Sequence, residues 1–169
     1  LAQWLPGESP ENFEGLSRHW HLLLPFGGAL LLGLCLHFVN PIHRFTGIPH
    51  VIAALHNGRG RLPPGNLLTQ FFGGLLALLS GQSGGREGPA VHIGAAASSL
   101  FGASLRLPNN SLRVMSACGT AAAIAASFNT PIAGVIFAME VVMLEYTVAG
   151  FVPVILAAVI ATTLSQAVF

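Results

Sequence analysis

The chain has 169 residues, of which 53% are hydrophobic and only 8% are charged, and its formal net charge at pH 7 is +1. Every basic residue is an arginine and every acidic residue is a glutamate, and charge-free stretches of about 20 residues, the length that a spanning helix needs, separate them. The composition predicts a multi-pass membrane protein, and the near-zero net charge argues against nucleic acid as a partner.

The predicted helices alternate with breaks that are rich in glycine and proline. The first is expected over His19 to Val39, and a short one, too short to span a membrane, over His50 to Asn57. The later helices are expected at Asn66 to Ser80, Pro89 to Leu105, Ser111 to Ser127, Pro131 to Glu140 and Val148 to Phe169. This pattern predicts an all-α, polytopic transmembrane bundle with broken, re-entrant helices.

Small residues recur every four positions in two neighbouring helices. They are Gly94, Ser98 and Gly102 in one helix and Gly119, Ala123 and Ser127 in the next. Because small side chains at this spacing let another backbone approach closely, we expect tight helix packing at these positions.

Three of the predicted helices begin deep in apolar sequence, at Gly47-Ile48-Pro49, Gly88-Pro89 and Asn129-Thr130-Pro131. The N–H groups at a helix start have no acceptor within the helix, and lipid offers none. Broken helices of this kind are typical of sites that bind a polar permeant near the bilayer midplane. A small anion fits such a site, because a helix start attracts it without the grip of a full positive charge.

The residues around the first two breaks are the candidate anion ligands. Glycine lets an anion approach the main chain, proline in the first turn removes no donor that the helix needs, and the threonine hydroxyl adds a donor. The candidate ligands are Thr46, Gly47, Ile48, Pro49, Arg86, Gly88 and Pro89.

Glu87 is the candidate gate of this site, since an ionisable residue at membrane depth is a functional hypothesis by default. In the ionised form its carboxylate occupies the anion site as a tethered anion, and protonation frees it to swing away and open the path. The structural alternative is an ion pair between Arg86 and Glu87 that holds the loop. The residues by themselves leave both readings open.

Three motifs resemble the CLC family of chloride channels and proton-coupled chloride antiporters. The segment GREGPAVHIG at 85–94 resembles the family's G-[KR]-E-G-P-x-V-Q-I-G. Thr46-Gly47-Ile48-Pro49 resembles its G-S-G-I-P, and the segment FNTPIAG at 128–134 resembles its F-N-x-P-L-A-G. The motifs occur in the family's order and extend from about Phe45 to Glu140.

The resemblance implies a voltage-gated-type chloride channel, with chloride as the permeant ion and with no cofactor, metal or enzymatic activity. It implies that Thr46 and the amides around Gly47, Ile48, Gly88 and Pro89 contact chloride, and that Glu87 is the outer gate. It also implies a homodimer within membrane lipid, in a bacterial inner (plasma) membrane. The family fold has two inverted halves, and we expect residues 1–169 to be the N-terminal half of that transmembrane domain, with the second half missing.

The chain departs from the family pattern at positions that bear on mechanism. Phe45 replaces a glycine, Thr46 replaces a serine, and His92 replaces a glutamine. The family's antiporters usually carry an inner, proton-accepting glutamate one residue after the position matched by Glu140, where this chain has Val141. Because valine cannot take a proton, the sequence favours a passive channel, with a proton-coupled chloride antiporter as the alternative.

A remote alternative is a rhomboid-like intramembrane serine protease, because Gly81-Gln82-Ser83-Gly84 fits the pattern G-x-S-G. That chemistry needs a histidine base packed against the serine, contributed in rhomboids by a later helix. No histidine follows His92, which lies nine residues after Ser83 and beyond the Gly88-Pro89 break. The histidine pattern therefore disfavours a protease.

Overall fold

The computed structural model describes residues 18–57, 60–82, 84–144 and 147–168, and these residues form helices and no strands. The predicted all-α class is therefore confirmed. Helices α1, α5 and α7 contain stretches that are long and apolar enough to cross a membrane. The elements are α1 (Arg18–Phe38), η3 (Pro41–His43), α2 (Gly47–His56), α3 (Pro64–Leu79), α4 (Glu87–Ser104), α5 (Asn109–Phe128), α6 (Pro131–Phe137), η4 (Ala138–Met143) and α7 (Val148–Val168).

The helices that follow the first two breaks begin earlier than the prolines suggested. Helix α2 starts at Gly47 rather than at His50, and α4 starts at Glu87 rather than at Pro89. Both prolines lie inside the first turn, where a residue without an N–H removes no intrahelical hydrogen bond. The glycine before each proline is therefore part of its helix.

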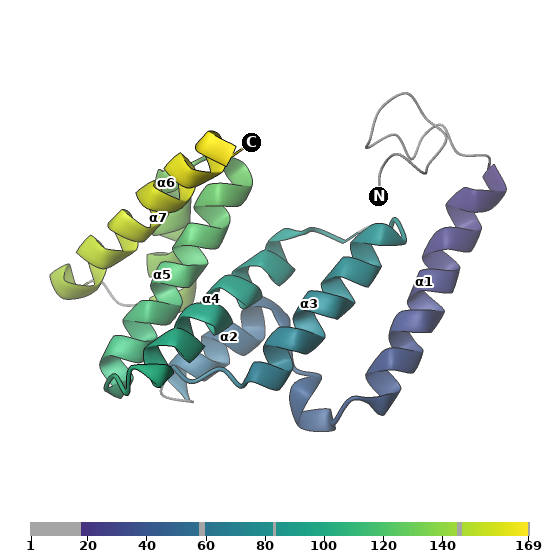
Figure 1. Ribbon diagram of the computed structural model, residues 1–169, viewed down its shortest axis with the longest axis horizontal. Helices are drawn as coiled ribbons and strands as arrows, with labels where there is room; N and C mark the ends of the chain where they lie inside the picture. The colour runs from purple at the N-terminus through teal and green to yellow at the C-terminus, as the bar shows by residue number, and fades with distance from the viewer. Residues whose placement is uncertain (1–17, 58–59, 83, 145–146, 169) are drawn as a thin grey trace.

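Helices α4 and α5 lie side by side (Figure 1) and touch at Gly94 and Gly119. A Cβ atom built on either glycine would overlap the carbonyl oxygen of the other. The same occurs where α6 meets α5, because a Cβ on Gly134 would reach the carbonyl oxygen of Ala121. The prediction of close packing at the small residues of α4 and α5 is confirmed.

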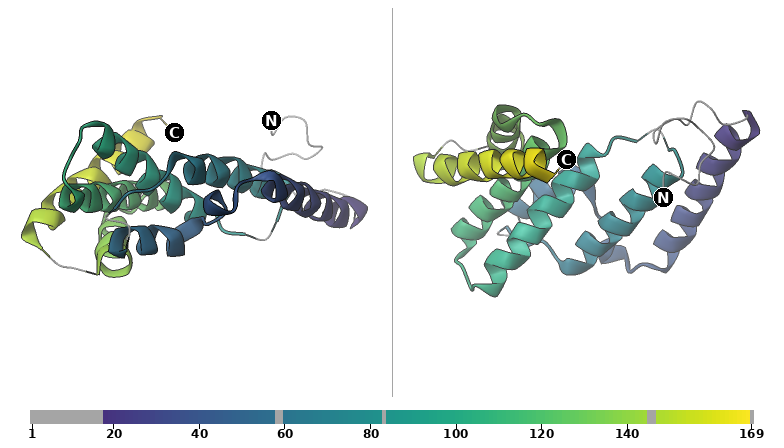
Figure 2. Two further views of the ribbon diagram at one scale, coloured as in Figure 1. Left: turned by 90° about the horizontal axis from the view of Figure 1, so that it is seen from below. Right: turned by 45° about the horizontal axis from the view of Figure 1, so that its top comes forward.

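The buried core lies among α2, α4, α5, α6, η4 and α7. Helix α1 stands at one edge, with α3 as its main neighbour (Figures 1 and 2). Most of its surface is exposed, including Leu22, Phe26 and Phe38. Apolar surface on this scale is typical of a helix that faces lipid or another protein segment. The core contains Val51, Leu55, Ala95, Ala117, Ala121, Val135, Met139 and Val154.

The connection between α2 and α3 is anchored in the interior by two serines. Ser99 Oγ donates a 2.6 Å hydrogen bond to the carbonyl oxygen of Gly60 and accepts one of 3.2 Å from the Leu62 N–H. Ser116 Oγ lies 3.3 Å from the same Gly60 oxygen. Gly60 has a φ of 75°, a left-handed conformation that favours glycine. This connection is therefore held against both α4 and α5.

The third break separates α5 from α6 at Asn129, whose φ of 55° ends α5. Helix α6 then begins at Pro131. The single helix predicted through Glu140 instead changes to a π-helical turn, η4, at Ala138. π-helical turns inside α-helices often occur at functional sites, so η4 is a candidate functional segment.

Candidate functional site

The start of α2 lies against the second turn of α4. The N–H of Gly47, the first residue of α2, donates a 3.0 Å hydrogen bond to Nδ1 of His92 in the second turn of α4. In Figure 1 both helices begin on the side of the molecule that faces α3. The structure therefore places the first break beside α4, four residues after Gly88 of the second break.

The backbone at the start of α2 has the conformation that its sequence favours. Gly47 has a φ of +81°, which a side chain would strain, and Thr46 before it is extended. The side chain of Thr46 makes no capping hydrogen bond, so its hydroxyl is not used by the helix itself. Ile48 and Pro49 follow in the first turn, half-buried and exposed respectively.

A fully buried asparagine holds the segment that leads into Thr46. Nδ2 of Asn66 in α3 donates to the carbonyl oxygens of Phe45, at 2.7 Å, and Ile42, at 3.2 Å. Its Oδ1 lies 3.2 Å from Nδ1 of His43. The sequence analysis missed this residue, although a lone amide at the start of an apolar helix was the available signal.

At the start of α4, Glu87 is the first helical residue and is half-buried. Its carboxylate lies against Gly85, because a Cβ atom built on Gly85 would overlap Glu87 Oε2. A Cβ on Gly88, by contrast, meets no heavy atom within 4 Å. Pro89 packs on α3, 3.0 Å from the position that a Cβ on Gly74 would take. The main chain at Gly88 is therefore approachable beside the carboxylate.

Arg86 is exposed and reaches the end of α5. Its Nη2 donates a 3.4 Å hydrogen bond to the carbonyl oxygen of Ser127 near the end of α5, where the helix dipole favours a cation. No ion pair joins Arg86 to Glu87 in the part of the chain that the structure describes. The structural alternative for these two residues, an ion pair that holds the loop, is therefore not observed.

Side chains from α2, α3 and α4 meet next to the start of α2: His50, Gln70 and His92. His92 is fully buried, and its Nε2 lies 3.4 Å from Nδ1 of His50 in α2. Because His92 Nδ1 accepts the Gly47 N–H, the neutral ring carries its proton on Nε2 and donates to His50. Gln70 Oε1 in α3 lies 3.3 Å from the same Nδ1. The sequence analysis noted His92 only as a departure from the family and missed Gln70.

The third break lies at the opposite end of α5 from the α4–α5 turn. Asn129 Oδ1 accepts a 2.7 Å hydrogen bond from Gln166 Nε2 in α7. Its link to the second break is the contact between Arg86 and Ser127. The first break thus contacts α4 through His92, and the third is joined to the start of α4 through Arg86.

Ser83, the nucleophile of the protease alternative, lies outside the described residues. His92, the last histidine of the chain, is engaged with Gly47, His50 and Gln70.

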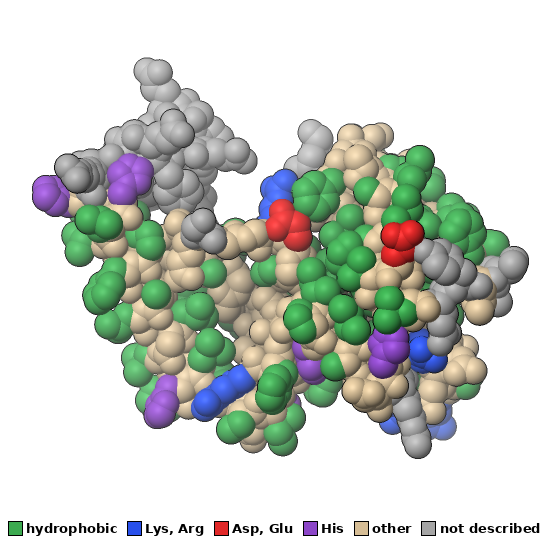
Figure 3. All heavy atoms as spheres, turned by 180° about the vertical axis from the view of Figure 1, so that it is seen from behind, with side chains coloured by type: hydrophobic (Ala, Val, Ile, Leu, Met, Phe, Trp, Pro, Cys, Tyr) green, Lys and Arg blue, Asp and Glu red, His purple; other side chains and the backbone are tan. Residues whose placement is uncertain are grey.

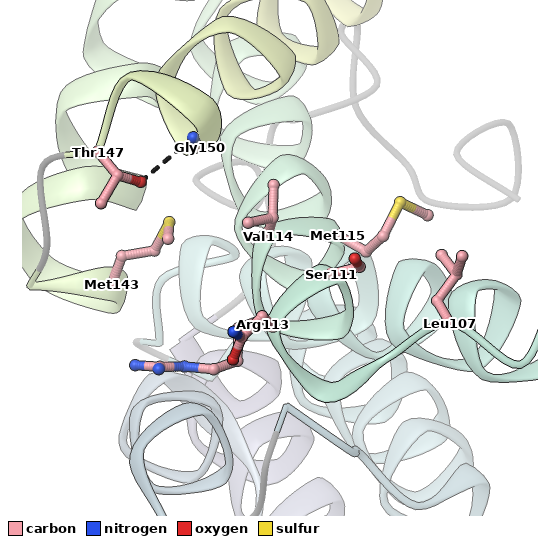
Figure 4. A pocket seen from close by; sticks show the side chains of 9 residues that line it. Leu107, Ser111, Arg113, Val114, Met115, Met143, Thr147 and Gly150 are labelled. Carbon is pink, nitrogen blue, oxygen red and sulfur yellow. Dashed lines mark hydrogen bonds between the residues drawn. The ribbon is translucent and has the colours of Figure 1, made fainter.

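A separate cavity of about 610 Å³ lies between the start of α5, η4 and the start of α7 (Figure 4). Thr147 Oγ1 accepts a 3.3 Å hydrogen bond from the Gly150 N–H at its edge. None of the candidate anion ligands lines it. Figure 3 shows charged side chains as isolated patches among hydrophobic ones on one face of the molecule. The cavity is lined by Leu107, Asn110, Ser111, Arg113, Val114, Met115, Met143, Thr147 and Gly150.

Comparison with known proteins gives consistent matches. The sequence profile of voltage-gated chloride channels matches residues 28–169. A protein of Ralstonia nicotianae, named as a ClcB-like chloride channel protein, is 35% identical over the whole of this chain and 41% of its own length. The H(+)/Cl(−) exchange transporter ClcA of Vibrio vulnificus is 34% identical over 88% of this chain and 34% of its own length.

A plant relative, the chloride channel protein CLC-c of Arabidopsis thaliana, is 32% identical over 73% of this chain and 18% of its own length. The chain thus spans well under half the length of each of these relatives. No solved structure matches it.

Proposed function

Because the chain belongs to the family of voltage-gated chloride channels, whose members are integral membrane proteins, we propose that it forms part of a transmembrane chloride pathway. Chloride is held at the starts of α2 and α4, by main-chain amides and the hydroxyl of Thr46. The observation that carries this proposal is the hydrogen bond between Gly47 and His92, which places the start of α2 beside the first two turns of α4. A single helix start would not make a site.

The electrostatics of two adjacent helix starts suit a conducted anion. Each start carries roughly half a positive charge, so together they attract a halide without a full cation in contact with it. A permeant ion must enter the site and also leave it, and a stronger positive charge would hold it too tightly. Arg86, whose guanidinium contacts Ser127, strengthens the positive potential from a distance.

Glu87 is the gate in this proposal. Its carboxylate is half-buried at the first position of α4, beside the approachable main chain of Gly88. An ionised carboxylate there competes with chloride for the helix start, and a protonated one does not. The absence of an Arg86–Glu87 ion pair among the described residues supports this role, because the side chain is not held by its neighbour.

Passive conduction is the mode that the residues favour over exchange. Val141 in η4 stands where the resemblance places the inner proton acceptor of the antiporters, and a valine binds no proton. The alternative, proton-coupled chloride antiport, is supported by the name of the Vibrio relative, an H(+)/Cl(−) exchange transporter.

The complete pathway includes more than these residues. We propose that a second half of the transmembrane domain covers the exposed apolar faces and that two copies assemble in the inner membrane of a bacterium. Large exposed side chains on α6 and α7, among them Ile132, Ile136 and Leu156, support a protein or lipid contact there. Bacterial sources of two of the relatives support the location.

The test is chloride efflux from liposomes that contain the complete polypeptide, with external chloride and pH recorded together. We expect chloride release that does not drive proton movement. Proton movement driven by the chloride gradient would show that the protein is an antiporter and not a passive channel. Liposomes that release chloride no faster than protein-free ones would contradict the proposed transport function.

A further inference from the structure

Nδ1 of His92 lies within hydrogen-bonding distance of the Gly47 N–H, at 3.0 Å, and of the Gln70 side-chain amide, at 3.3 Å. What this nitrogen does depends on whether it carries a proton, and the Gln70 amide can turn to present either its oxygen or its nitrogen. Without a proton Nδ1 accepts from Gly47, and with a proton it donates to Gln70 and leaves the Gly47 amide without its acceptor.

We propose that His92, supported by His50, is a positioning residue that links proton binding to anion binding at the start of α2. The inference rests on the proposed chloride site and names how that site is regulated. In the linked state one proton from solution sits on Nδ1 of His92, which donates to Gln70. The proton on Nε2 still donates to His50, and the released Gly47 N–H donates to the anion.

The charge balance explains why the proton and the anion bind together. Burial penalises a lone imidazolium, and an anion at this site has no full cation beside it. A protonated His92 and an anion form a neutral pair, each with its own hydrogen bonds, and pairing of this kind offsets the cost of burial. By reciprocity, an anion that raises proton affinity gains affinity itself when the pH falls.

The surroundings contain two other proton acceptors to separate from His92, which are His50 and Glu87. Helix α2 presents His50, and α3 presents the uncharged Gln70. Helix α5 packs on this part of α4 with Gly119 and Ala123, which carry no ionisable group. On α4 itself Glu87 lies five residues earlier. An experiment on His92 therefore needs the Glu87→Gln background.

The substitution to test is His92→Gln, because glutamine stands at this position in the family motif that the segment at 85–94 resembles. A glutamine can accept the Gly47 hydrogen bond but takes up no proton in the physiological range. His56→Gln is the control, because His56 lies on α2, is exposed, and within the described part of the chain hydrogen-bonds to the Ile52 carbonyl oxygen of its own helix, at 2.8 Å.

The test is calorimetric titration of chloride into the complete polypeptide in detergent between pH 5 and pH 7.5. Two buffers of different ionisation enthalpy give the number of protons taken up with each chloride. In the Glu87→Gln protein we expect proton uptake and an affinity that rises as the pH falls, by at most about tenfold per pH unit for one linked proton. Adding His92→Gln should remove both effects and leave chloride binding. Adding His56→Gln should change neither.

The outcomes separate the two proposals. Chloride binding to the Glu87→Gln protein with no proton uptake and no pH dependence would overturn the role of His92 alone. That measurement needs no change at His92, so it stands even if His92→Gln fails to fold. Proton uptake that survives His92→Gln would also overturn it. No chloride binding at any pH would overturn the proposed chloride site and this inference with it.

Discussion

The guanidinium of Arg86 spans 41 positions of sequence to reach the carbonyl oxygen of Ser127, at 3.4 Å. This contact ties the start of α4 to the end of α5, where the third break begins. Arg86 is thus anchored to α5, whereas the carboxylate of Glu87 is held by no ion pair among the described residues.

The first prediction concerns Glu87. We expect Glu87→Gln to remove the acid activation of chloride flux, because an amide neither ionises nor competes with chloride. The measurement is chloride efflux from liposomes at saturating chloride, where a change in affinity has no effect. Glu140→Gln, at an exposed position of η4, is the control and should keep the pH response. An unchanged response in Glu87→Gln would remove this residue from the gate.

The second prediction compares two glycines of the proposed site. Gly47→Ala forces a side chain into a φ of +81° and should lower stability by about 1–2 kcal/mol. Gly88→Ala meets open space and should keep or slightly raise stability. Both should weaken chloride binding, since both place a methyl group where the anion approaches. Thermal unfolding in detergent and chloride calorimetry measure the two effects. Equal loss of stability in both variants would contradict the assigned backbone conformation.

The third prediction concerns the crossing of α4 and α5. Gly94→Ala places a methyl group on the Gly119 carbonyl oxygen and should destabilise the protein by about 1–3 kcal/mol. Gly33→Ala in α1, where the added methyl meets nothing within 4 Å, should be neutral or stabilising by up to about 1 kcal/mol. The two melting temperatures in the same detergent give the comparison. A Gly94→Ala protein as stable as Gly33→Ala would argue against this close approach.

The fourth prediction concerns the buried connection between α2 and α3. Ser99→Ala leaves the Gly60 carbonyl oxygen with the longer Ser116 contact and the Leu62 N–H without its acceptor, so stability should fall by about 1–3 kcal/mol. The control is Ser104→Ala, because Ser104 is exposed and, among the described residues, bonds within its own helix to the Phe101 carbonyl oxygen; this change should alter stability by less than about 0.5 kcal/mol. Chemical denaturation measures both. A loss in Ser104→Ala as large as in Ser99→Ala would point to a general effect of serine removal.

The sequence predicted the helices and the breaks because both follow from local chemistry. Apolar runs require helices in lipid, and glycine with proline interrupts them, so the breaks before α2, α4 and α6 were visible. The crossing at Gly94 and Gly119 was also predictable, since close approach needs small residues at a fixed spacing. The starts of α2 and α4 were placed too late, because proline is tolerated throughout the first turn and need not be its first residue.

The contacts behind the candidate site could not be predicted, since they join distant segments. Asn66 and Gln70 lie in an apolar helix with nothing local to indicate their partners, which are 21 residues earlier and 22 residues later in the chain, Phe45 and His92. Such pairs depend on how α3 sits against α2 and α4. A single sequence contains no direct record of that arrangement.

The π-helical turn at 138–143 has a consequence for natural variation in chain length. A π-helix holds one residue more in each hydrogen-bonded ring than an α-helix, so removing one residue there can restore ordinary α-helix without moving the flanking helices apart. We therefore expect single-residue deletions to be tolerated in η4 and not in the middle of α5. At η4 the chain can therefore lose one residue while α6 and α7 keep their positions in the fold.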